Sequence, residues 1–411
     1  MLEKFHDFPL LILVVLSACL AVALHFLGAG FLAEPIQFGS TSLGKSIAAL
    51  AKDALFVPLK PIMYALIIMS IGSSLAISHG GMGAKFIRVL SFMALFSVIG
   101  AAIAIVGYTV FSFLPILPDP ASVTTGHEVA IRKITFPEKM YGVLTSPLMI
   151  SIYAGILFGK ALKARGLGEK ADEISDLFMK GFRRFLQYTI PLAVFGSITL
   201  ALSKPGGVET LGNLAPLLIV YLSTFLVVEI IMIAVTTIVL RQPLGVILRA
   251  VFPQAIVALS TSSSVATLPA SKIACDDMGA NGDESTPFIT IGATINMVGT
   301  LMGLTILSLY AMHSYGLDVS LADKVVVALQ SLIYSVSAAG VPSASVVLLQ
   351  DILTSQGVSA EYATIVTGLI ITIDTLALDR LRTMLNTQSD SMSTVMGLHT
   401  YYKRPKVLAE D

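Results

Sequence analysis

The sequence predicts an all-α polytopic membrane protein with eight transmembrane helices and two re-entrant helical hairpins. Three observations support this fold class. Hydrophobic residues make up 55% of the 411 residues and charged residues only 13%, whereas soluble domains carry about 25% charged residues. Apolar runs of about 20 residues, the length that crosses a bilayer, recur along the chain and raise its mean hydropathy to +0.85. Two shorter apolar pairs in the second half are each broken by small polar residues.

Charge and cysteine content exclude several classes of protein. The 26 basic and 26 acidic residues give zero formal net charge, which argues against nucleic acid as a partner. Cys19 and Cys275 are too few for a disulfide framework, and Cys19 lies inside an apolar run. The six histidines show no metal-ligand spacing. Composition therefore predicts the lipid bilayer as the main surroundings of the chain.

The first half of the chain predicts six membrane helices. Its first apolar run, residues 8–27, is about as long as a bilayer is thick and lacks a small-residue cleavage site. We therefore expect a true first helix and not a signal peptide. A longer polar loop is expected at residues 117–141. The six predicted spans lie near residues 8–30, 55–78, 88–115, 142–163, 177–202 and 214–240.

Basic residues predict the orientation of these helices. The connection at residues 160–184 carries seven Lys or Arg residues and is the most basic one. Since cytoplasmic loops are enriched in Lys and Arg, this loop is expected inside, and so are both termini. Six helices then return the chain to the cytoplasm near residue 241. The sequence thus predicts an integral protein of the plasma (inner) membrane with cytoplasmic N- and C-termini.

The second half of the chain has a different pattern. The apolar run at residues 246–259 is too short to cross a bilayer at about 1.5 Å per residue, and five consecutive Ser or Thr residues follow it. A second short pair, residues 322–336 and 344–353, breaks around a Gly and a Pro. Full spans follow the two pairs, near residues 287–313 and 362–396. This order is typical of transporters built from inverted repeats, with ordinary water-facing loops as the alternative for each break taken alone.

The last predicted span carries a polar stretch, residues 374–394. Spacings of three, four and four residues place its Asp379, Arg382, Asn386 and Asp390 on one face of a helix. Each Asp or Arg costs roughly 2.5–3.5 kcal/mol at the centre of a membrane, so we expect these side chains to face a polar site inside the protein. A surface helix with solvated charges is the alternative.

An acidic and a basic side chain on one helix face can bind both ends of a zwitterion. A guanidinium binds a carboxylate through paired hydrogen bonds, and a carboxylate binds an ammonium group. Asp379 and Arg382, three residues apart, therefore predict an amino-acid site.

Four motifs occur in the order expected of one transporter family. Together with the pattern of helices and hairpins they cover the whole chain, which resembles the dicarboxylate/amino acid:cation symporters, including the excitatory amino acid transporters and other glutamate/aspartate transporter homologues. The motifs are Thr261 to Pro269 (TSSSVATLP), Gly292 to Thr300 (GATINMVGT), Ser337 to Pro342 (SAAGVP) and Asp379 to Asp390 (DRLRTMLNTQSD).

The resemblance implies a homotrimer and an elevator mechanism, in which one domain carries the substrate across while a scaffold stays fixed. It assigns residues 1–86 to scaffold helices 1 and 2, and residues 87–116 to helix 3 of the transport domain. Residues 117–212 would hold an extracellular loop and scaffold helices 4 and 5. Residues 213–411 would complete the transport domain with helix 6, hairpin 1, helix 7, hairpin 2 and helix 8.

The resemblance also implies a substrate site. Arg382 would hold a side-chain carboxylate of the substrate and Asp379 its ammonium group. The tips of the two hairpins would hold the α-carboxylate, because N–H groups at the start of a helix attract anions. The other residues implied are Ser262, Ser263 and Ser264 of the first hairpin, Met297 and Thr300 of helix 7, Val341, Pro342 and Ser345 of the second hairpin, and Thr383 and Asn386 of helix 8.

A sodium site is implied beside the substrate site, with sodium as a coupling ion and no cofactor. Gly292, Asn296, Asn386 and Asp390 would supply carbonyl and carboxylate oxygens, which hard cations prefer. A second, deeper sodium site of the family needs an Asp where this chain has Val298. We therefore expect reduced or altered sodium dependence, with a proton on Asp390 as the alternative coupling ion.

The resulting expectation is a secondary active symporter of acidic amino acids, such as aspartate or glutamate, and not an enzyme. A C4-dicarboxylate carrier is the rival, but Asp379 would repel a dianion that lacks an ammonium group. A neutral amino acid would leave the Arg382 charge buried without a counterion. A proton-coupled or uncoupled facilitative carrier is a further alternative, as is a receptor or channel. An intramembrane hydrolase is not expected, because no Ser–His or paired-Asp arrangement lies near the middle of a span.

Overall fold

The computed structural model describes residues 10–38, 41–77, 83–113, 136–145, 147–203, 214–337 and 344–399. Within these ranges the chain is almost entirely helical, with one two-stranded sheet. The helices are α1 (Leu10–Phe26), η2 (Gly30–Ala33), α2 (Ile47–Ile77), α3 (Gly83–Ser112), α5 (Phe136–Leu144), α6 (Pro147–Ala164), α7 (Gly168–Leu202), α9 (Leu214–Leu240), α10 (Leu244–Thr261), α11 (Ser264–Asp277), α12 (Gly282–Ile295), α13 (Val298–Ser314), α14 (Leu321–Ser337), α15 (Ala344–Ser355), α16 (Ala360–Ile373), η3 (Asp374–Leu378) and α17 (Asp379–Leu398).

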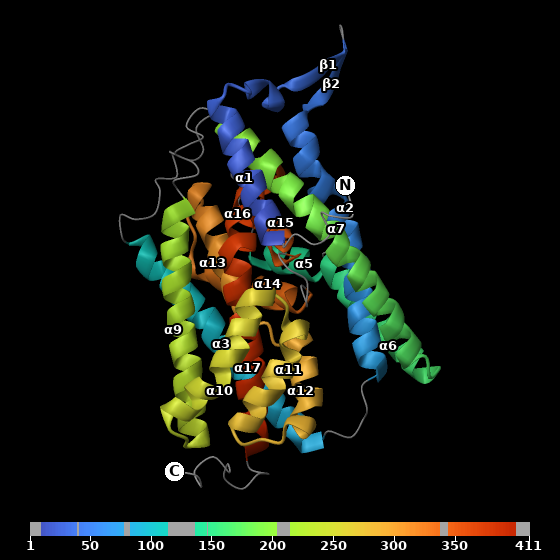
Figure 1. Cartoon of the computed structure of the whole chain (residues 1–411), viewed down its shortest axis with the longest axis vertical. Coiled ribbons are helices and arrows are strands. Elements are labelled where there is room, and N and C mark those ends of the chain that lie inside the picture. The colour runs from blue at the N-terminus through green and yellow to red at the C-terminus, as the bar shows by residue number, and fades with distance from the viewer. Residues whose placement is uncertain are drawn as a thin grey trace.

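Four helices from the first half of the chain form one group. α2 packs along both α6 and α7, and α1 packs on α7 (Figure 1). Glycines permit close approach between them: a Cβ on Gly196 of α7 would lie 2.3 Å from the carbonyl oxygen of Ala48 in α2. These are the helices for which the scaffold role is predicted.

The remaining long helix of the first half, α3, packs among helices of the second half. It contacts α9, α13, α14 and α17, and it lies beside α9 and α17 in Figure 1. The polar helix α17 therefore has neighbours on every side: α3, α9, α10, α11, α12 and α13 all pack against it. Such packing explains why residues 382–398 of α17, apart from Met384, are buried although the sequence is polar.

Within the described residues of the second half, the regular helices are interrupted at three places. α10 ends at Thr261 and α11 begins at Ser264, and the two pack against each other as a hairpin. α12 and α13 are separated by Asn296 and Met297, within the span predicted to be interrupted there. The last span continues from α16 into α17 through η3, a short π-helix. Where a helix is interrupted, backbone N–H and C=O groups lose their helical partners, and side chains or a bound solute must then satisfy them.

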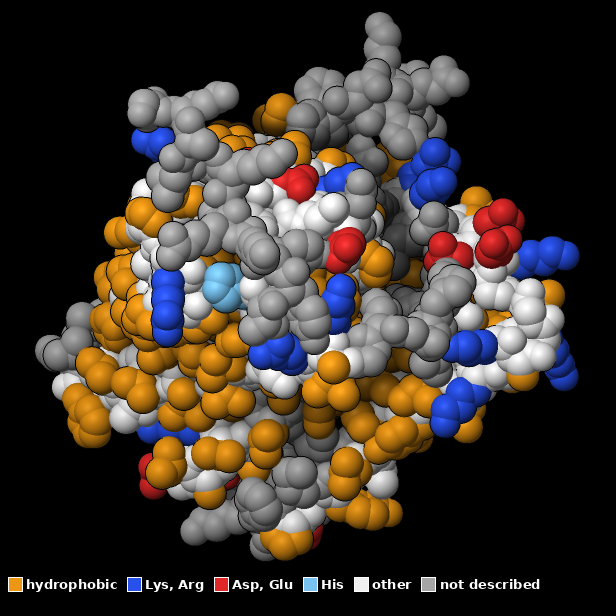
Figure 2. Space-filling model, turned by 90° about the horizontal axis from the view of Figure 1, so that it is seen from below, with side chains coloured by type: hydrophobic (Ala, Val, Ile, Leu, Met, Phe, Trp, Pro, Cys, Tyr) orange, Lys and Arg blue, Asp and Glu red, His pale blue; other side chains and the backbone are white. Residues whose placement is uncertain are grey.

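The outer surface fits a membrane. Among the described residues, five helical stretches are long and apolar enough to cross one: Ala84–Ser112, Leu214–Leu240, Leu244–Thr261, Glu284–Ser314 and Tyr362–Leu398. Figure 2, viewed along the long axis, shows hydrophobic side chains over much of the outline. Large apolar side chains such as Phe252, Ile256 and Ile230 are more than half exposed, as lipid contact would require. The chain is thus consistent with an integral membrane protein, and its count of eight spans stays a prediction.

Two short elements differ from the expected all-α pattern. Strands β1 (Pro35–Phe38) and β2 (Thr41–Ser46) pair antiparallel just before α2, where Thr, Ser and Gly residues disfavour a helix. The prediction of a long loop at residues 117–141 is also wrong at its C-terminal end, because α5 begins at Phe136. Pro137 in the first turn of α5 is compatible with a helix start, since proline lacks only an N–H that no helical carbonyl would accept there.

Candidate functional site

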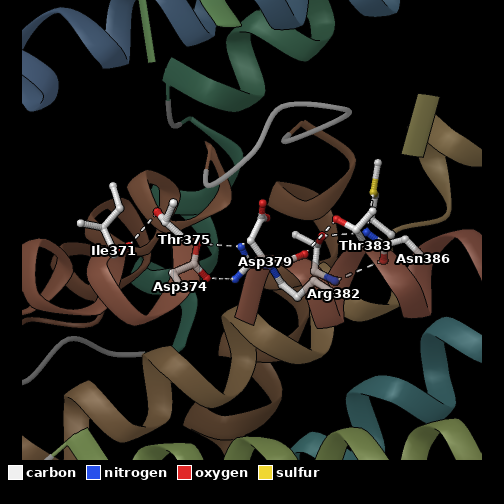
Figure 3. A network of polar contacts seen from close by, with 9 residues as sticks. Ile371, Asp374, Thr375, Asp379, Arg382, Thr383 and Asn386 are labelled. Atoms are coloured by element: carbon white, nitrogen blue, oxygen red, sulfur yellow. Dashed lines mark hydrogen bonds and ion pairs between the residues drawn. The ribbon is translucent and has the colours of Figure 1, made fainter. Parts of the chain in front are cut away.

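The centre of the buried polar region is a cluster of one guanidinium and two carboxylates (Figure 3). Arg382 binds Asp374 in a bidentate pair, through Nη1 to Oδ1 and through Nη2 to Oδ2, the latter at 2.9 Å. Its Nη2 also donates to Oδ1 of Asp379 at 2.9 Å. The side chains of Arg382 and Asp374 are 1% and 0% exposed. The cluster therefore carries two negative charges and one positive charge in a nearly dry environment.

A π-helical turn brings the two carboxylates together. In η3 the N–H of Asp379 donates to the carbonyl of Asp374, five residues earlier. A π-turn holds one residue more than an α-turn, so residues five apart come to lie on the same side of the helix. Asp374 and Asp379 both reach Arg382 for this reason. Sequence reasoning predicted Asp379 and Arg382 but missed Asp374, because spacing on a regular α-helix does not place it on their face.

Asn386 joins α17 to the start of α13. Its Oδ1 accepts from the backbone N–H of Gly299 at 2.7 Å and of Thr300 at 3.3 Å. Its Nδ2 donates to Oγ1 of Thr300 at 3.1 Å and to the sulfur of Met297 at 3.1 Å. The structure thus brings together three of the predicted substrate residues, with Asn386 satisfying the free N–H groups that begin α13. Thr383, one turn earlier, donates within α17 to the carbonyl of Asp379 at 2.8 Å.

Close helix packing depends on glycine at this point. A Cβ on Gly299 would lie 2.4 Å from the carbonyl oxygen of Arg382, so α13 and α17 approach as only a missing side chain allows. A Cβ on Gly303 would lie 2.8 Å from both Cδ of Arg382 and the hydroxyl of Tyr221. Tyr221, on α9, was not predicted as part of this region. A tyrosine inside an apolar run gives no signal of that role in the sequence.

The first hairpin lies against the same helix. Arg380, the residue after Asp379, donates through Nη1 to the carbonyls of Leu259 at 2.6 Å and Ser260 at 3.1 Å, near the end of α10. Gln254 of α10 donates to the carbonyl of Thr387 at 2.7 Å. The hairpin is therefore hydrogen-bonded to α17 at two positions along that helix, Arg380 and Thr387.

The tip of this hairpin is the start of α11, where a role in binding the α-carboxylate is predicted. Ser262 is in the left-handed region with φ of 50°, and Ser263 caps α11 by accepting from the N–H of Ala266 at 3.3 Å. Ser264 is the first residue of α11 and is 5% exposed. A non-glycine residue in the left-handed region stores strain, which persists at functional sites. The N–H groups at the start of α11 attract an anion such as a carboxylate.

The second hairpin lies mostly outside the described part of the chain. Val341 and Pro342 are outside the described residues, and so is the side chain of Ser345, whose backbone lies in the first turn of α15. Their predicted role in binding the α-carboxylate stays a prediction.

Three of the four predicted sodium ligands meet between α12 and α17. Asn296 donates through Nδ2 to Oδ1 of Asp390 at 2.9 Å and to Oγ of Ser389 at 2.8 Å. A Cβ on Gly292 would lie 2.6 Å from Oδ1 of Asp390, so the carboxylate rests against glycine backbone. The Oδ1 of Asn296 is buried and has no hydrogen-bond partner among the described residues. Unsatisfied oxygens beside a buried carboxylate are the ligands that a hard cation takes.

The fourth predicted ligand, Asn386, is engaged elsewhere. Both groups of its amide are used at the start of α13, one helical turn from Asp390. Asp390 itself is 2% exposed. A sodium ion at this position would thus rely on Asp390, the Asn296 oxygen and backbone carbonyls around Gly292.

Val298 fills the position where a second carboxylate is expected in the family. It is fully buried, and a Cβ on Gly100 of α3 would lie only 2.9 Å from its Cγ1. The neighbouring α3 side chains Met93 and Phe96 are also buried. Val298 is thus closely packed against α3, and the Val298, Met93 and Phe96 side chains offer no oxygen to a cation.

Comparison with known proteins agrees with these features. The model of the sodium:dicarboxylate symporter family matches residues 10–399. A serine/threonine transporter, SstT, of Streptococcus agalactiae serotype III (strain NEM316) is 24% identical over 310 residues, which cover 72% of this chain and 76% of that protein. The serine/threonine transporter SstT of Streptococcus thermophilus (strain CNRZ 1066) is 26% identical over 253 residues, 61% of this chain and 62% of that protein.

Proposed function

Because the chain belongs to the sodium:dicarboxylate symporter family, we propose that it carries a small amino acid across the membrane together with a cation. The zwitterion binds at the start of α17, with its ammonium group on Asp379 and its α-carboxylate at the N–H groups of the hairpin tips. Ser263 and Ser264 lie at the start of α11, and Thr300 and Asn386 lie where α13 meets α17. This role is that of a transporter, without an enzymatic step.

The observation that carries the proposal is the charge of the buried cluster. Asp374, Asp379 and Arg382 sum to one negative charge, and Asp379 is the most exposed of the three, at 7%. A buried charge without a counterion is unfavourable by several kcal/mol, so the cluster favours a cationic group beside it. The ammonium of an amino acid supplies that charge, and C4-dicarboxylates lack it.

The side chain of the substrate is expected to be small and neutral, as in serine or threonine. From sequence alone, a neutral substrate is disfavoured because it would leave Arg382 without a counterion. In the structure, Asp374 supplies that counterion. End-on pairing with Asp374 uses one N–H of each Nη atom, and Asp379 takes the second N–H of Nη2. The two N–H groups left on Arg382 point to opposite sides of the guanidinium, so they cannot together hold one carboxylate. The names of the streptococcal relatives agree with this substrate class.

Acidic amino acids, the substrates expected from sequence, are the second candidate. The spacing of Asp379 and Arg382 favours them, since the two groups would bind the ammonium and the side-chain carboxylate of aspartate or glutamate. In that case the substrate carboxylate must displace Asp374 from Arg382. Such an exchange of one carboxylate for another conserves the charge at the guanidinium, but it moves Asp374 away from Arg382, the cation with which it pairs.

Sodium is the proposed coupling ion, at Asp390, Asn296 and the backbone near Gly292. The packing of Val298 against α3 supports the absence of the deeper sodium ion, and fewer sodium ions would then move with each substrate than is typical of the family. Proton coupling and uncoupled facilitated transport are the alternatives for the same fold.

The elevator mechanism, the homotrimer and cytoplasmic termini are proposed from the family resemblance. In this proposal α1, α2, α6 and α7 form the scaffold, within residues 1–86 and 117–212. The transport domain contains α3 and residues 213–411. Each helix group packs mainly within itself, and the two meet where α7 contacts α16, which supports this division.

Uptake into proteoliposomes tests the proposed function. Purified protein is reconstituted with an inward sodium gradient, and uptake of labelled serine, threonine, aspartate, glutamate and succinate is compared. We expect sodium-dependent uptake of serine or threonine, with succinate excluded. Uptake of aspartate in preference to serine would favour the second candidate. Uptake of succinate but no amino acid would contradict the role of Asp379.

A further inference from the structure

A carboxyl group lies in the membrane outside both proposed sites. Glu229 is in the middle of α9, a 27-residue apolar helix that is long enough to cross a membrane. The residue is 8% exposed, so the carboxyl is turned into the protein and not toward lipid. Ionisable groups inside membrane helices are rare because they are costly, and where they occur they usually have a function.

Glu229 faces α17 on the side away from the sodium ligands. The Gln388 side chain hydrogen-bonds its carboxyl, and α9 packs along α17. Gln388 is 1% exposed. It lies two residues before Asp390, and on an α-helix a spacing of two residues points side chains about 200° apart. Glu229 and Asp390 are therefore on different faces of α17.

Two oxygens of this pair lack a donor. Oε2 of Glu229 and Oε1 of Gln388 are buried, and neither has a hydrogen-bond partner in the described part of the chain. A buried acceptor without a donor is unfavourable, and two of them in one hydrogen-bonded pair require an explanation. The amide N–H groups of Gln388 are its only donors, so an ionised Glu229 leaves its own second oxygen and the amide oxygen unsatisfied.

No cation of the surrounding helices compensates Glu229 within the described structure. The surroundings that act on the carboxyl are its burial and the Gln388 hydrogen bond. On α17, Arg382 is bound to Asp374 and Asp379, and Arg380 to carbonyls of α10. The other charged or titratable groups on α9 and on the helices packed against it are Tyr221 on α9, Lys85, Arg88 and Tyr108 on α3, Arg249 on α10, Tyr310 and His313 on α13, and Asp390 on α17.

We propose that Glu229 and Gln388 form an intramembrane proton-binding site. A proton on Oε2 of Glu229 turns an acceptor into a donor, which can satisfy the amide oxygen of Gln388 while the amide N–H satisfies the other carboxyl oxygen. The pair then has no unsatisfied group facing its partner and no net charge. One added proton thus neutralises the buried charge and allows both unsatisfied oxygens to take part in a hydrogen bond.

A metal cation fits the same pair less well. Hard cations in proteins take about six oxygen ligands, and the pair offers two free ones. Among the described residues there is no group of three or more His, Cys, Asp or Glu side chains. A proton needs only the two acceptors that are present.

The site deepens the proposed transport function and rests on it for its consequence. Since α9 packs on α10, α13 and α17, Glu229 would move with the proposed transport domain. A protonated Glu229 makes that domain more neutral, and a change of its surroundings during transport would let the proton exchange. Proton binding by itself, however, is measurable without transport.

Infrared difference spectroscopy of the purified protein at neutral pH, with sodium present, tests the site. We expect a C=O band of a protonated, hydrogen-bonded carboxylic acid that disappears in Glu229→Gln. Gln388→Leu should keep the band but move it to higher frequency, because the carbonyl loses its hydrogen bond. The matched control is Asp53→Asn, which removes a partly buried carboxylate paired with Lys45 and should leave the band intact.

Three results would overturn the proposal. The band could be absent from the wild-type protein, or it could persist in Glu229→Gln. It could also appear only when sodium is withdrawn, as a cation site would require. If Glu229→Gln does not fold, the shift in Gln388→Leu still decides the assignment. If the wild-type protein shows the band but takes up no amino acid in proteoliposomes, the transport proposal is contradicted and the proton site is still supported.

Discussion

Asp374 and Arg382 are eight residues apart and bind each other through both oxygens and both terminal nitrogens, in a pair that is almost fully buried. The π-helical turn between them makes this possible. The pair changes what Arg382 can do, because its charge is balanced before any substrate binds. In the proposed transport function, substrate selection would therefore depend on whether Asp374 keeps or releases the guanidinium.

Asp374→Asn should shift selection toward acidic substrates. The substitution removes one negative charge and leaves Arg382 paired with Asp379 alone. A substrate carboxylate can then bind the Arg382 guanidinium without displacing the carboxylate of Asp374. We expect the ratio of aspartate to serine affinity to rise at least tenfold, or about 1.4 kcal/mol. Competition binding with both amino acids measures the ratio. An unchanged ratio would show that Asp374 does not control the guanidinium.

Removing both members of the pair should cost less stability than removing one. Arg382→Leu leaves Asp374 and Asp379 buried without a cation, a situation that typically costs about 3–5 kcal/mol. The double variant Arg382→Leu with Asp374→Asn removes one of those charges and should recover part of the loss. Thermal unfolding in detergent measures the coupling. Additive effects of the two substitutions would contradict a direct energetic pairing.

Asp379→Asn should damage amino-acid binding. The carboxylate that receives the ammonium group becomes neutral, and the loss of one member of a buried, hydrogen-bonded charge pair costs roughly 2–5 kcal/mol. The affinity for serine should fall by at least 30-fold, while any weak binding of succinate should not fall. Isothermal titration with each compound distinguishes the two. An equal loss for both would mean that Asp379 only orients Arg382.

Gly292→Ala should weaken sodium dependence. The new Cβ would lie 2.6 Å from Oδ1 of Asp390, so the carboxylate must move away from Asn296. We expect the sodium concentration for half-maximal uptake to rise about tenfold or more. Gly245→Ala is the matched control, because a Cβ there meets nothing within 4 Å. If the two variants behave alike, the sodium ion does not bind at Asp390.

Val298→Asp should restore a second sodium ion. The new carboxylate would stand in the apolar contact with Gly100 of α3 and supply the charge that this position lacks. The dependence of substrate binding on sodium should become steeper, with a Hill coefficient above that of the wild type. Val298→Asn, which adds polarity without charge, is the control. A wild-type protein that already requires two or more sodium ions would contradict the proposed absence of the deeper site.

The positions of the breaks could be predicted from local sequence. The Ser and Thr residues near 260–264 mark the tip of the first hairpin, and Asn296 marks the interruption between α12 and α13. These predictions rely on short apolar lengths and on residues that disfavour a helix, both of which act locally. The sequence also predicted that Gly292, Asn296 and Asp390 meet, through their motifs.

The start of α5, the β1–β2 pair and the role of Asp374 could not be predicted in this way. The first two depend on weak local preferences that neighbouring segments override. Asp374 requires a π-turn, whose extra residue shifts all later side chains relative to a regular helix.

The sequence by itself determined that this chain is a membrane protein of the symporter family, since hydropathy and motif order are properties of the chain alone. It also determined which helix carries the charged site. The tertiary structure decided how those charges are paired. Asp374 with Arg382, Asn386 with the start of α13, and Val298 with Gly100 are contacts set by the helix turn and by packing between distant segments. Because a buried charge acts mainly on its nearest partners, we expect these contacts, and not the presence of an arginine alone, to decide which substrate the proposed site accepts.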